Sequence, residues 1–172
     1  MAVTHSLAHT VPGSAQPPSH LLKYVNQQLC RRYSEASGSF VTAFYAIFDP
    51  HDLSLTYSSA GHNPPRVKCC SDGTVRTLDS KDGLPLGLLE ECRYSDTRIP
   101  LKSGDQLVLY TDGITEAMNP EGELFGKQRL DLILTGCSPA QQLHDAILES
   151  LDAFARGRQA DDDRTLVIGR VI

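Results

Sequence analysis

Apolar residues recur at helical spacing in two parts of the chain. From Leu21 to Tyr33 they form one stripe, and Ser19 stands where a helix N-cap is expected. Residues 138–141 have the pattern of a capping box, and the apolar positions of residues 143–154 share one helical face. The pattern therefore predicts a helix near each end of the chain, and residues 1–10 also have the spacing of a helix.

The middle of the chain predicts short strands instead. Residues 40–48 and 106–110 are apolar on both alternating faces, which is typical of strands that are covered on both sides. Residues 53–58 alternate apolar and polar side chains, as a half-buried strand does. Further strands are expected over residues 66–70, 75–78, 93–99 and 166–172. Because helices do not alternate with these strands, we expect the α+β class, with mostly antiparallel sheets packed together and helices outside.

Composition narrows the class of protein. A length of 172 residues predicts one domain. The 16 Lys and Arg against 21 Asp and Glu give a net charge of −5, which argues against a nucleic-acid binder. No apolar run approaches the roughly 18 residues of a membrane span. Five cysteines without a Cys-x-x-Cys pair fit neither a disulfide framework nor a zinc site, so we expect reduced thiols and a cytoplasmic protein without a membrane segment.

Carboxylates stand at the ends of two predicted strands. Asp112-Gly113 follows the strand 106–110, and Asp161-Asp162-Asp163 directly precedes the last strand. Strand ends on a rigid scaffold can bring carboxylates into one cleft, where a cation must offset their repulsion. Hard divalent ions such as Mg²⁺ and Mn²⁺ prefer such oxygen ligands. An ordinary turn and a solvated acidic loop are the alternative interpretations of the two motifs.

Residues 60–65, Ala-Gly-His-Asn-Pro-Pro, predict an irregular bend that presents His62 and Asn63. These two side chains either serve a site or satisfy nearby backbone groups. The 172 residues contain no nucleophile elbow, no P-loop and no dinucleotide fingerprint. Nucleophilic catalysis by serine or cysteine therefore has no support.

A series of segments, in this order, resembles the bacterial branch of the metal-dependent, type 2C-like (PPM-type) serine/threonine protein phosphatases. That branch contains the sporulation stage II protein E type and the regulators of stress sigma factors. The resemblance covers nearly the whole chain, and the ordered series is more specific than any one motif. The segments are FVTAFY at 40–45, YSSAGHNPP at 57–65, GLPLG at 83–87, GDQLVLYTDGITEA at 104–117, FG at 125–126, RL at 129–130 and DDRTLV at 162–167.

The resemblance implies a four-layer α-β-β-α sandwich of two antiparallel sheets flanked by helices. It also implies hydrolysis of phosphoserine or phosphothreonine with two Mn²⁺ or Mg²⁺ ions, which lower the pKa of a shared water and neutralise phosphoryl oxygens. No catalytic residue is implied apart from the metal ligands. By motif match the ligands would be Asp112 and Asp162, with Gly113, Asp163, Gly61, His62 and Asn63 in supporting positions or at the edge of the site.

One motif of the family is missing from these residues. Gly-Asp-x-Ser-Gly-His-Gly, whose Asp bridges the two ions, has no match, and residues 1–9 are similar to the later part of the helix that follows it. We therefore expect residues 1–172 to form a partial phosphatase domain without its first strand and the start of its first helix. We also expect one weak metal site or none, and exposed sheet edges that favour a homodimer.

Competing functions remain open at this point. The resemblance implies a phosphorylated regulatory protein as substrate, an antagonist of an anti-sigma factor, and a sensory or receiver domain upstream in the parent protein. The alternative is a catalytically silent binding module that keeps the phosphatase fold. The retained Asp112 and Asp162 favour the enzyme, whereas the missing bridging Asp favours the silent module. An unrelated metal-binding structural protein is a third and weaker alternative.

Overall fold

The computed structural model describes residues 4, 7–8, 16–34, 40–80, 82–136 and 138–172. The chain divides into two compact units, each formed from two stretches of sequence. The first unit comprises residues 1–64 and 79–101, and the second comprises residues 65–78 and 102–172. The helix predicted over residues 1–10 lies almost entirely outside the described residues.

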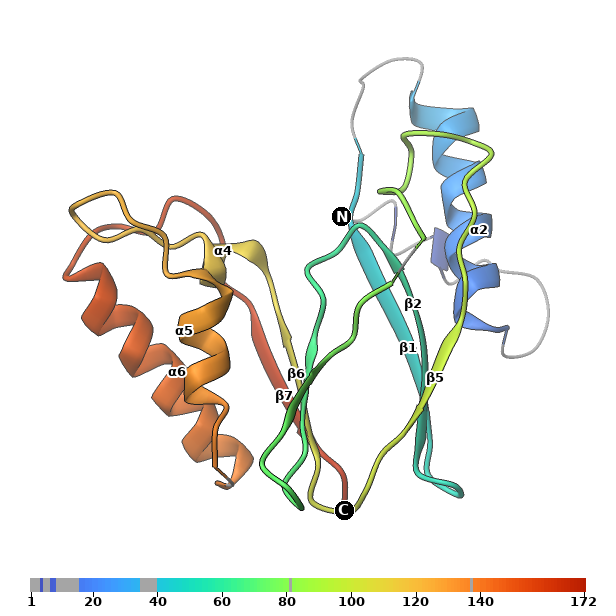
Figure 1. The fold of residues 1–172 in the computed structure, drawn as a ribbon. Helices are drawn as coiled ribbons and strands as arrows, with labels where there is room; N and C mark the ends of the chain where they lie inside the picture. The colour runs from blue at the N-terminus through green and yellow to red at the C-terminus, as the bar shows by residue number, and fades with distance from the viewer. Residues whose placement is uncertain (1–3, 5–6, 9–15, 35–39, 81, 137) are drawn as a thin grey trace. The chain divides into compact units, whose positions relative to one another are not determined.

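The first unit is a three-stranded antiparallel sheet with a helix packed on it (Figure 1). Its strands lie in the order β1–β2–β5, and the register pairs Ala43 with Ala60 and Leu55 with Ile99. The apolar face of the helix, with Leu22 and Val25, is buried in the core of this unit. The elements are α2 (Pro18–Leu29), η1 (Cys30–Ser34), β1 (Ala43–Asp49), β2 (Ser54–Ala60) and β5 (Thr97–Pro100).

The start of α2 differs from the prediction. Pro17 is the N-cap residue and Pro18 is the first helical residue, so Ser19 lies inside the helix and does not cap it. Asp96 provides the cap instead, because its carboxylate accepts hydrogen bonds from the Ser19 backbone N–H at 2.7 Å and from its hydroxyl at 2.8 Å. The sequence prediction placed the helix correctly but assigned its capping group to the wrong residue.

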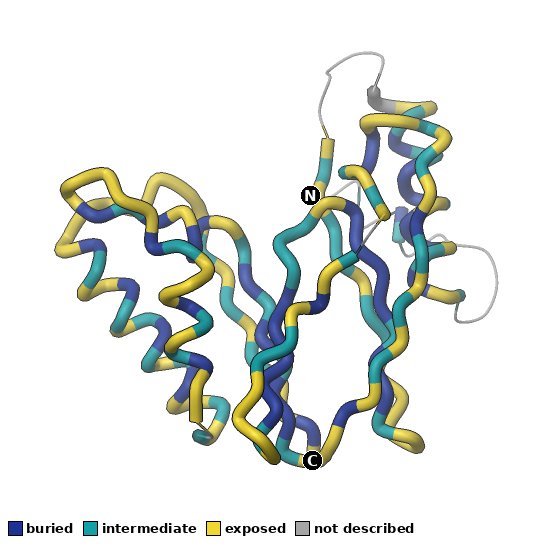
Figure 2. Tube along the Cα trace, in the orientation of Figure 1, coloured by how far each residue is buried: buried dark blue, intermediate teal, exposed yellow. Residues whose placement is uncertain are grey.

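Two strands of the first unit are buried differently from the prediction. β1 begins three residues after Phe40, which is 57 % exposed, and Phe48 on β1 is also exposed, so this strand is not covered on both sides (Figure 2). β2 is buried at nearly every position, including Ser58 and Ser59, and is not half-buried. The reason is its central place between β1 and β5, where small polar side chains can be enclosed.

A buried amide ties α2 to the loop that follows Gly83-Leu-Pro-Leu-Gly87. The side chain of Asn26 is completely buried. Its Oδ1 accepts a hydrogen bond from the Gly87 N–H at 2.9 Å, and its Nδ2 donates to the carbonyl oxygens of Leu89 and Glu90. One side chain thus satisfies three backbone groups of a loop that has no regular secondary structure.

The second unit is a four-stranded antiparallel sheet with helices on it (Figure 1). Its strands lie in the order β4–β3–β6–β7. Leu143, Ile147 and Leu151 of the longest helix are fully buried in its core, which confirms the predicted apolar face. The elements are β3 (Arg66–Lys68), β4 (Val75–Thr77), β6 (Gln106–Tyr110), α4 (Asp112–Thr115), α5 (Gly126–Ile133), α6 (Ala140–Ala155) and β7 (Leu166–Arg170). The predicted α+β class, two antiparallel sheets flanked by helices, is confirmed.

The predicted capping box before α6 is wrong. Pro139 is the N-cap residue, and no side chain caps the helix. Ser138 instead presents its carbonyl oxygen to Nε2 of Gln106 on β6, at 2.7 Å. This long-range contact engages the Ser138 backbone, and no local pattern reveals it.

Two further observations bear on the sequence predictions. Among the described helices, none is both long enough and apolar enough to cross a bilayer. Cys30, Cys69 and Cys92 form no disulfide bond, but Cys70 is disulfide-bonded. The expectation that all thiols are reduced is therefore wrong for Cys70.

Candidate metal centre

Both predicted carboxylate segments lie at the same end of one strand pair in the second unit. β6 and β7 are antiparallel neighbours, and Tyr110, the last residue of β6, pairs with Leu166, the first residue of β7. Asp112 follows β6 and begins α4, while Asp162 and Asp163 lie four and three residues before the start of β7. The end of β6 and the start of β7 therefore lie side by side.

Thr111 holds these two segments together beyond the strand ladder. Its backbone N–H donates to the Thr165 carbonyl oxygen at 3.1 Å. Its hydroxyl accepts from the Thr165 N–H at 2.9 Å and donates to the Asp163 carbonyl oxygen at 3.1 Å. One side chain thus fixes the backbone on both sides of Arg164, next to the carboxylates.

Gly113 lets its backbone lie closer to the Asp163 backbone than a residue with a side chain would permit. A β-carbon built on Gly113 would lie 2.4 Å from the Asp163 carbonyl oxygen and 3.3 Å from that of Asp162. The backbone of Gly113 is not in the left-handed region, so the requirement for glycine is one of space. The segments that carry Asp112 and Asp162 are consequently in direct backbone contact.

The carboxylates themselves are exposed and lightly bonded. Oδ1 of Asp112 accepts from the Gly113 N–H at 3.0 Å, and Oδ1 of Asp162 accepts from the Asp163 N–H at 2.7 Å. Within the part of the chain that the structure describes, neither carboxylate forms an ion pair. Asp161 differs, because its Oδ2 lies 3.2 Å from Nη2 of Arg158. Asp161 is therefore paired with a cationic side chain, whereas Asp162 forms no ion pair with any described residue.

A small cavity of about 120 Å³ adjoins the Asp162 segment. Glu116 and Asp162 line it together with Gly113 and Arg164. The Arg164 guanidinium lies 3.6 Å from the Asp152 carboxylate of α6, and its Nε is buried without an acceptor among the described residues. The cavity wall thus carries acidic groups with one partly buried cation beside them.

The donor set suits a hard cation only in part. Mg²⁺ in proteins commonly keeps several waters and is held by one or two carboxylates, which Asp112 and Asp162 could provide. The described residues contain no group of three or more His, Cys, Asp or Glu side chains that could hold a metal. The local chemistry therefore fits a weakly held, largely hydrated ion at Asp112 and Asp162.

The remaining predicted residues, Gly61, His62 and Asn63, belong to the first unit. Gly61 has a φ of +70°, and a β-carbon there would lie 2.7 Å from the Pro85 side chain, so a glycine is required. Nδ1 of His62 lies 3.3 Å from the Thr42 hydroxyl, and both His62 and Asn63 are half-buried. Their expected position at the edge of the metal site stays a prediction.

Sequence reasoning missed Thr111 and Arg164. Thr111 stands between a strand and an Asp-Gly pair, so it looked like an ordinary turn residue. Its role depends on the pairing of β6 with β7, which are more than 50 residues apart in sequence. Arg164 stands beside Asp163 and could have been recognised as the cation nearest the acidic run.

Comparison with known proteins shows which family this sequence resembles. The model of the family described as Stage II sporulation protein E (SpoIIE) matches residues 1–172. Phosphoserine phosphatase RsbU of Bacillus subtilis (strain 168) is 34 % identical over 162 residues. The match covers 94 % of this chain but 47 % of that relative, so the chain spans about half the length of RsbU.

Solved structures with low sequence identity share the fold. The SiaA-PP2C domain of Pseudomonas aeruginosa has a TM-score of 0.81 at 20 % identity, covering 99 % of this chain and 67 % of that one. The phosphatase domain of SpoIIE from Bacillus subtilis, in a form presoaked with Mn, has a TM-score of 0.66 at 22 % identity, covering 98 % and 73 %. At these identities the likeness establishes the fold alone.

Proposed function

The chain belongs to the stage II sporulation protein E (SpoIIE) family, and on that premise we propose that it is part of a metal-dependent phosphoserine/phosphothreonine protein phosphatase. The observation that carries the proposal is the contact between Gly113 and Asp163, which brings the Asp112 and Asp162 segments together. Two carboxylates at one place repel each other unless a cation lies between them. A binding module has no physical need for that arrangement.

In this proposal each residue of the site has a distinct part. Asp112 and Asp162 hold a divalent cation, Mn²⁺ or Mg²⁺, through the oxygens that accept no backbone hydrogen bond. The Gly113 and Asp163 N–H groups orient these carboxylates by binding their Oδ1 atoms. Thr111 keeps the two backbones in register. When bound, the cation neutralises phosphoryl oxygens and lowers the pKa of its water.

The proposed substrate is a phosphorylated regulatory protein, an antagonist of an anti-sigma factor. Support comes from the relative RsbU, which is named a phosphoserine phosphatase. Because RsbU is about twice as long as the matched region, a sensory or receiver domain in the parent protein is part of the same proposal. The proposed location is the cytoplasm, where such a regulatory protein would be found.

A catalytically silent binding module is the second candidate. One observation favours it, namely that the described residues hold no group of three or more metal-ligating side chains. In a phosphatase of this kind, a further carboxylate must then come from elsewhere. The Gly-Asp-x-Ser-Gly-His-Gly motif, absent from the 172 residues, is the expected source.

A turnover assay separates the two candidates. p-Nitrophenyl phosphate and a phosphoserine protein are offered, with and without Mn²⁺, to residues 1–172 and to the same chain preceded by a segment with that motif. We expect Mn²⁺-dependent turnover from the extended chain and negligible turnover from residues 1–172. No turnover by the extended, folded chain would support the silent module. Robust turnover by residues 1–172 would mean that another residue replaces the missing aspartate.

A further inference from the structure

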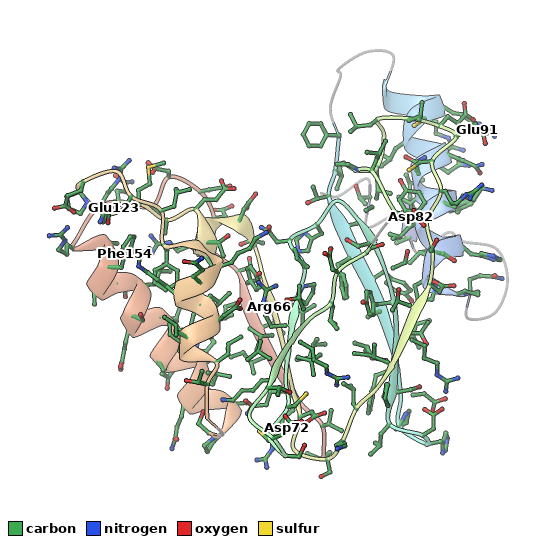
Figure 3. All side chains as sticks on the ribbon, viewed as in Figure 1. Arg66, Asp72, Asp82, Glu91, Glu123 and Phe154 are labelled. Carbon is green, nitrogen blue, oxygen red and sulfur yellow. The ribbon has the colours of Figure 1, made fainter. Side chains whose placement is uncertain are left out.

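A second cavity lies in the first unit, between the start of α2 and residues 91–94. Its volume is about 420 Å³, within the range of roughly 300–1,000 Å³ that is typical of small-molecule sites. His20 and Lys23 of α2 form one wall, and Cys92 and Arg93 form the other. Figure 3 labels Glu91, which belongs to the same segment beside α2.

The cavity is lined by an excess of positive groups. His20 and Lys23 are three residues apart on a helix, so their side chains share one side of α2. Arg93 adds a guanidinium from the facing segment. Glu91 is the one acidic residue of the lining. With His20 counted as neutral, as in the net charge of −5, Lys23 and Arg93 against Glu91 leave the lining one positive charge in excess.

The three basic side chains of the lining are exposed and form no ion pair within the part of the chain that the structure describes. His20, Lys23 and Arg93 are all solvent-accessible, and none forms an ion pair with another described residue. The Asp96 carboxylate, which is not part of the lining, accepts two hydrogen bonds from Ser19. The positive charges of the lining are therefore available to an external ligand.

One lining residue of the cavity, Tyr94, is held in place. Tyr94 is buried, and its hydroxyl donates a hydrogen bond to the Leu84 carbonyl oxygen at 3.0 Å. Burial also raises the pKa of the Tyr94 hydroxyl, so this residue adds no negative charge. The cavity thus has one fixed, neutral lining residue beside its basic side chains.

We propose that this cavity binds a small oxyanion that carries two or more carboxylate or phosphate groups. Arg93 would hold one oxyanion with its planar fork of donors, and Lys23 and His20 would pair with the other group across the cavity. The proposal is independent of the phosphatase function, because it uses none of the carboxylates of the metal centre.

Binding is tested on metal-free residues 1–172, prepared over a chelating resin at low salt, with citrate and inorganic pyrophosphate as separate probes. Calorimetric titration measures the affinity, and amide chemical shifts locate the site. We expect saturable binding of one equivalent of at least one probe, with shifts at residues 19–23 and 91–94. Citrate alone would identify a carboxylate ligand, and pyrophosphate alone a phosphate ligand.

A matched pair of variants decides whether the cavity is responsible. Lys23→Gln with Arg93→Gln removes two charges from the lining, and should weaken binding about tenfold or more, since one charge at 4 Å in water contributes about 1 kcal/mol. Lys127→Gln with Arg170→Gln removes two exposed charges in the second unit and should change affinity less than about twofold. Equal weakening by both pairs, or no saturable binding of either probe, would overturn the proposal.

Discussion

A β-carbon at Gly113 would lie 2.4 Å from the carbonyl oxygen of Asp163, closer than real side chains approach a backbone. This contact joins a residue three positions after β6 to a residue three positions before β7. It is tightened by Thr111, whose hydroxyl donates to the same carbonyl oxygen at 3.1 Å. The two proposed metal ligands are therefore positioned by backbone packing and do not depend on direct contact between their side chains.

The first prediction concerns this packing. Gly113→Ala should destabilise the protein by about 1–3 kcal/mol, because the new methyl group forces the Asp163 backbone away. Alanine has a higher helix propensity than glycine, so helix propensity alone would make Gly113→Ala stabilise the protein. Gly169→Ala on β7 is the control, since nothing lies within 4 Å of its β-carbon position. Chemical denaturation measures both variants, and equal stability of the two would contradict the proposed contact.

The second prediction concerns which aspartate of the run binds metal. Asp161 is paired with Arg158, whereas Asp162 has no cationic partner among the described residues. In the chain that carries the Gly-Asp-x-Ser-Gly-His-Gly segment, Asp162→Asn should abolish turnover of p-nitrophenyl phosphate. Asp161→Asn should leave most of it. Similar losses in the two variants would show that the assigned register is wrong.

The third prediction concerns metal binding by residues 1–172 alone. Asp112 and Asp162 can attract one hydrated ion, but Mg²⁺ and Mn²⁺ give up their waters reluctantly to so few ligands. Calorimetric titration with Mn²⁺ should therefore show one weak site. Asp112→Asn should remove that site while the folded structure persists, because it relieves repulsion between carboxylates. Two tight sites, or unchanged binding by the variant, would refute this assignment.

The fourth prediction concerns the buried amide of α2. Asn26→Ala leaves the Gly87 N–H and two carbonyl oxygens without their partner, and should cost about 1–3 kcal/mol of unfolding free energy. Gln28→Ala on the same helix is the control and should stay within about 0.5 kcal/mol. Amide exchange of residues 84–92 should accelerate only in the Asn26 variant. Protection that persists there would mean that the loop is held by other contacts.

The fifth prediction concerns pH. Burial lowers the pKa of Lys68, whose residue is 1 % exposed, below the 10.5 of a free lysine. At pH values below the folded-state pKa, Lys68 is charged in both the folded and the unfolded protein, and the full cost of burying the ammonium lowers the free energy of unfolding. As pH rises through that pKa towards 10.5, the folded state loses its proton first and wild-type stability increases.

Lys68→Met should therefore stabilise the protein on the order of 1 kcal/mol at pH 7, and its advantage should shrink towards pH 10. The exposed Lys127→Met is the control and should shift stability little at either pH. Denaturation curves at pH 7 and pH 10 measure the difference in unfolding free energy between each variant and the wild type. An advantage of Lys68→Met that does not change with pH would contradict the role of burial.

Local sequence patterns succeeded where a single element decides its own structure. The apolar face of α6 follows from the spacing of Leu143, Ile147 and Leu151, and the strand Gln106–Tyr110 has the predicted bounds. The predicted caps were wrong because a local motif does not fix which residue stands at a helix terminus or which distant group reaches it. Asp96 caps α2 in place of Ser19, and Pro139 is the N-cap residue of α6.

For this protein, the sequence by itself determined the class of fold, the strand-end positions of Asp112 and Asp162, and the family resemblance. Periodicity and motif order are local properties, so they can be read without coordinates. Only the tertiary structure decided that Thr111 and Gly113 lock these carboxylate segments together, and that Asp161 is drawn to Arg158. The first outcome depends on how β6 and β7 pair across more than 50 residues, and such a contact forms only when the chain has folded. The Arg158–Asp161 ion pair spans only three residues, but the sequence pattern does not show which aspartate of the run Arg158 engages.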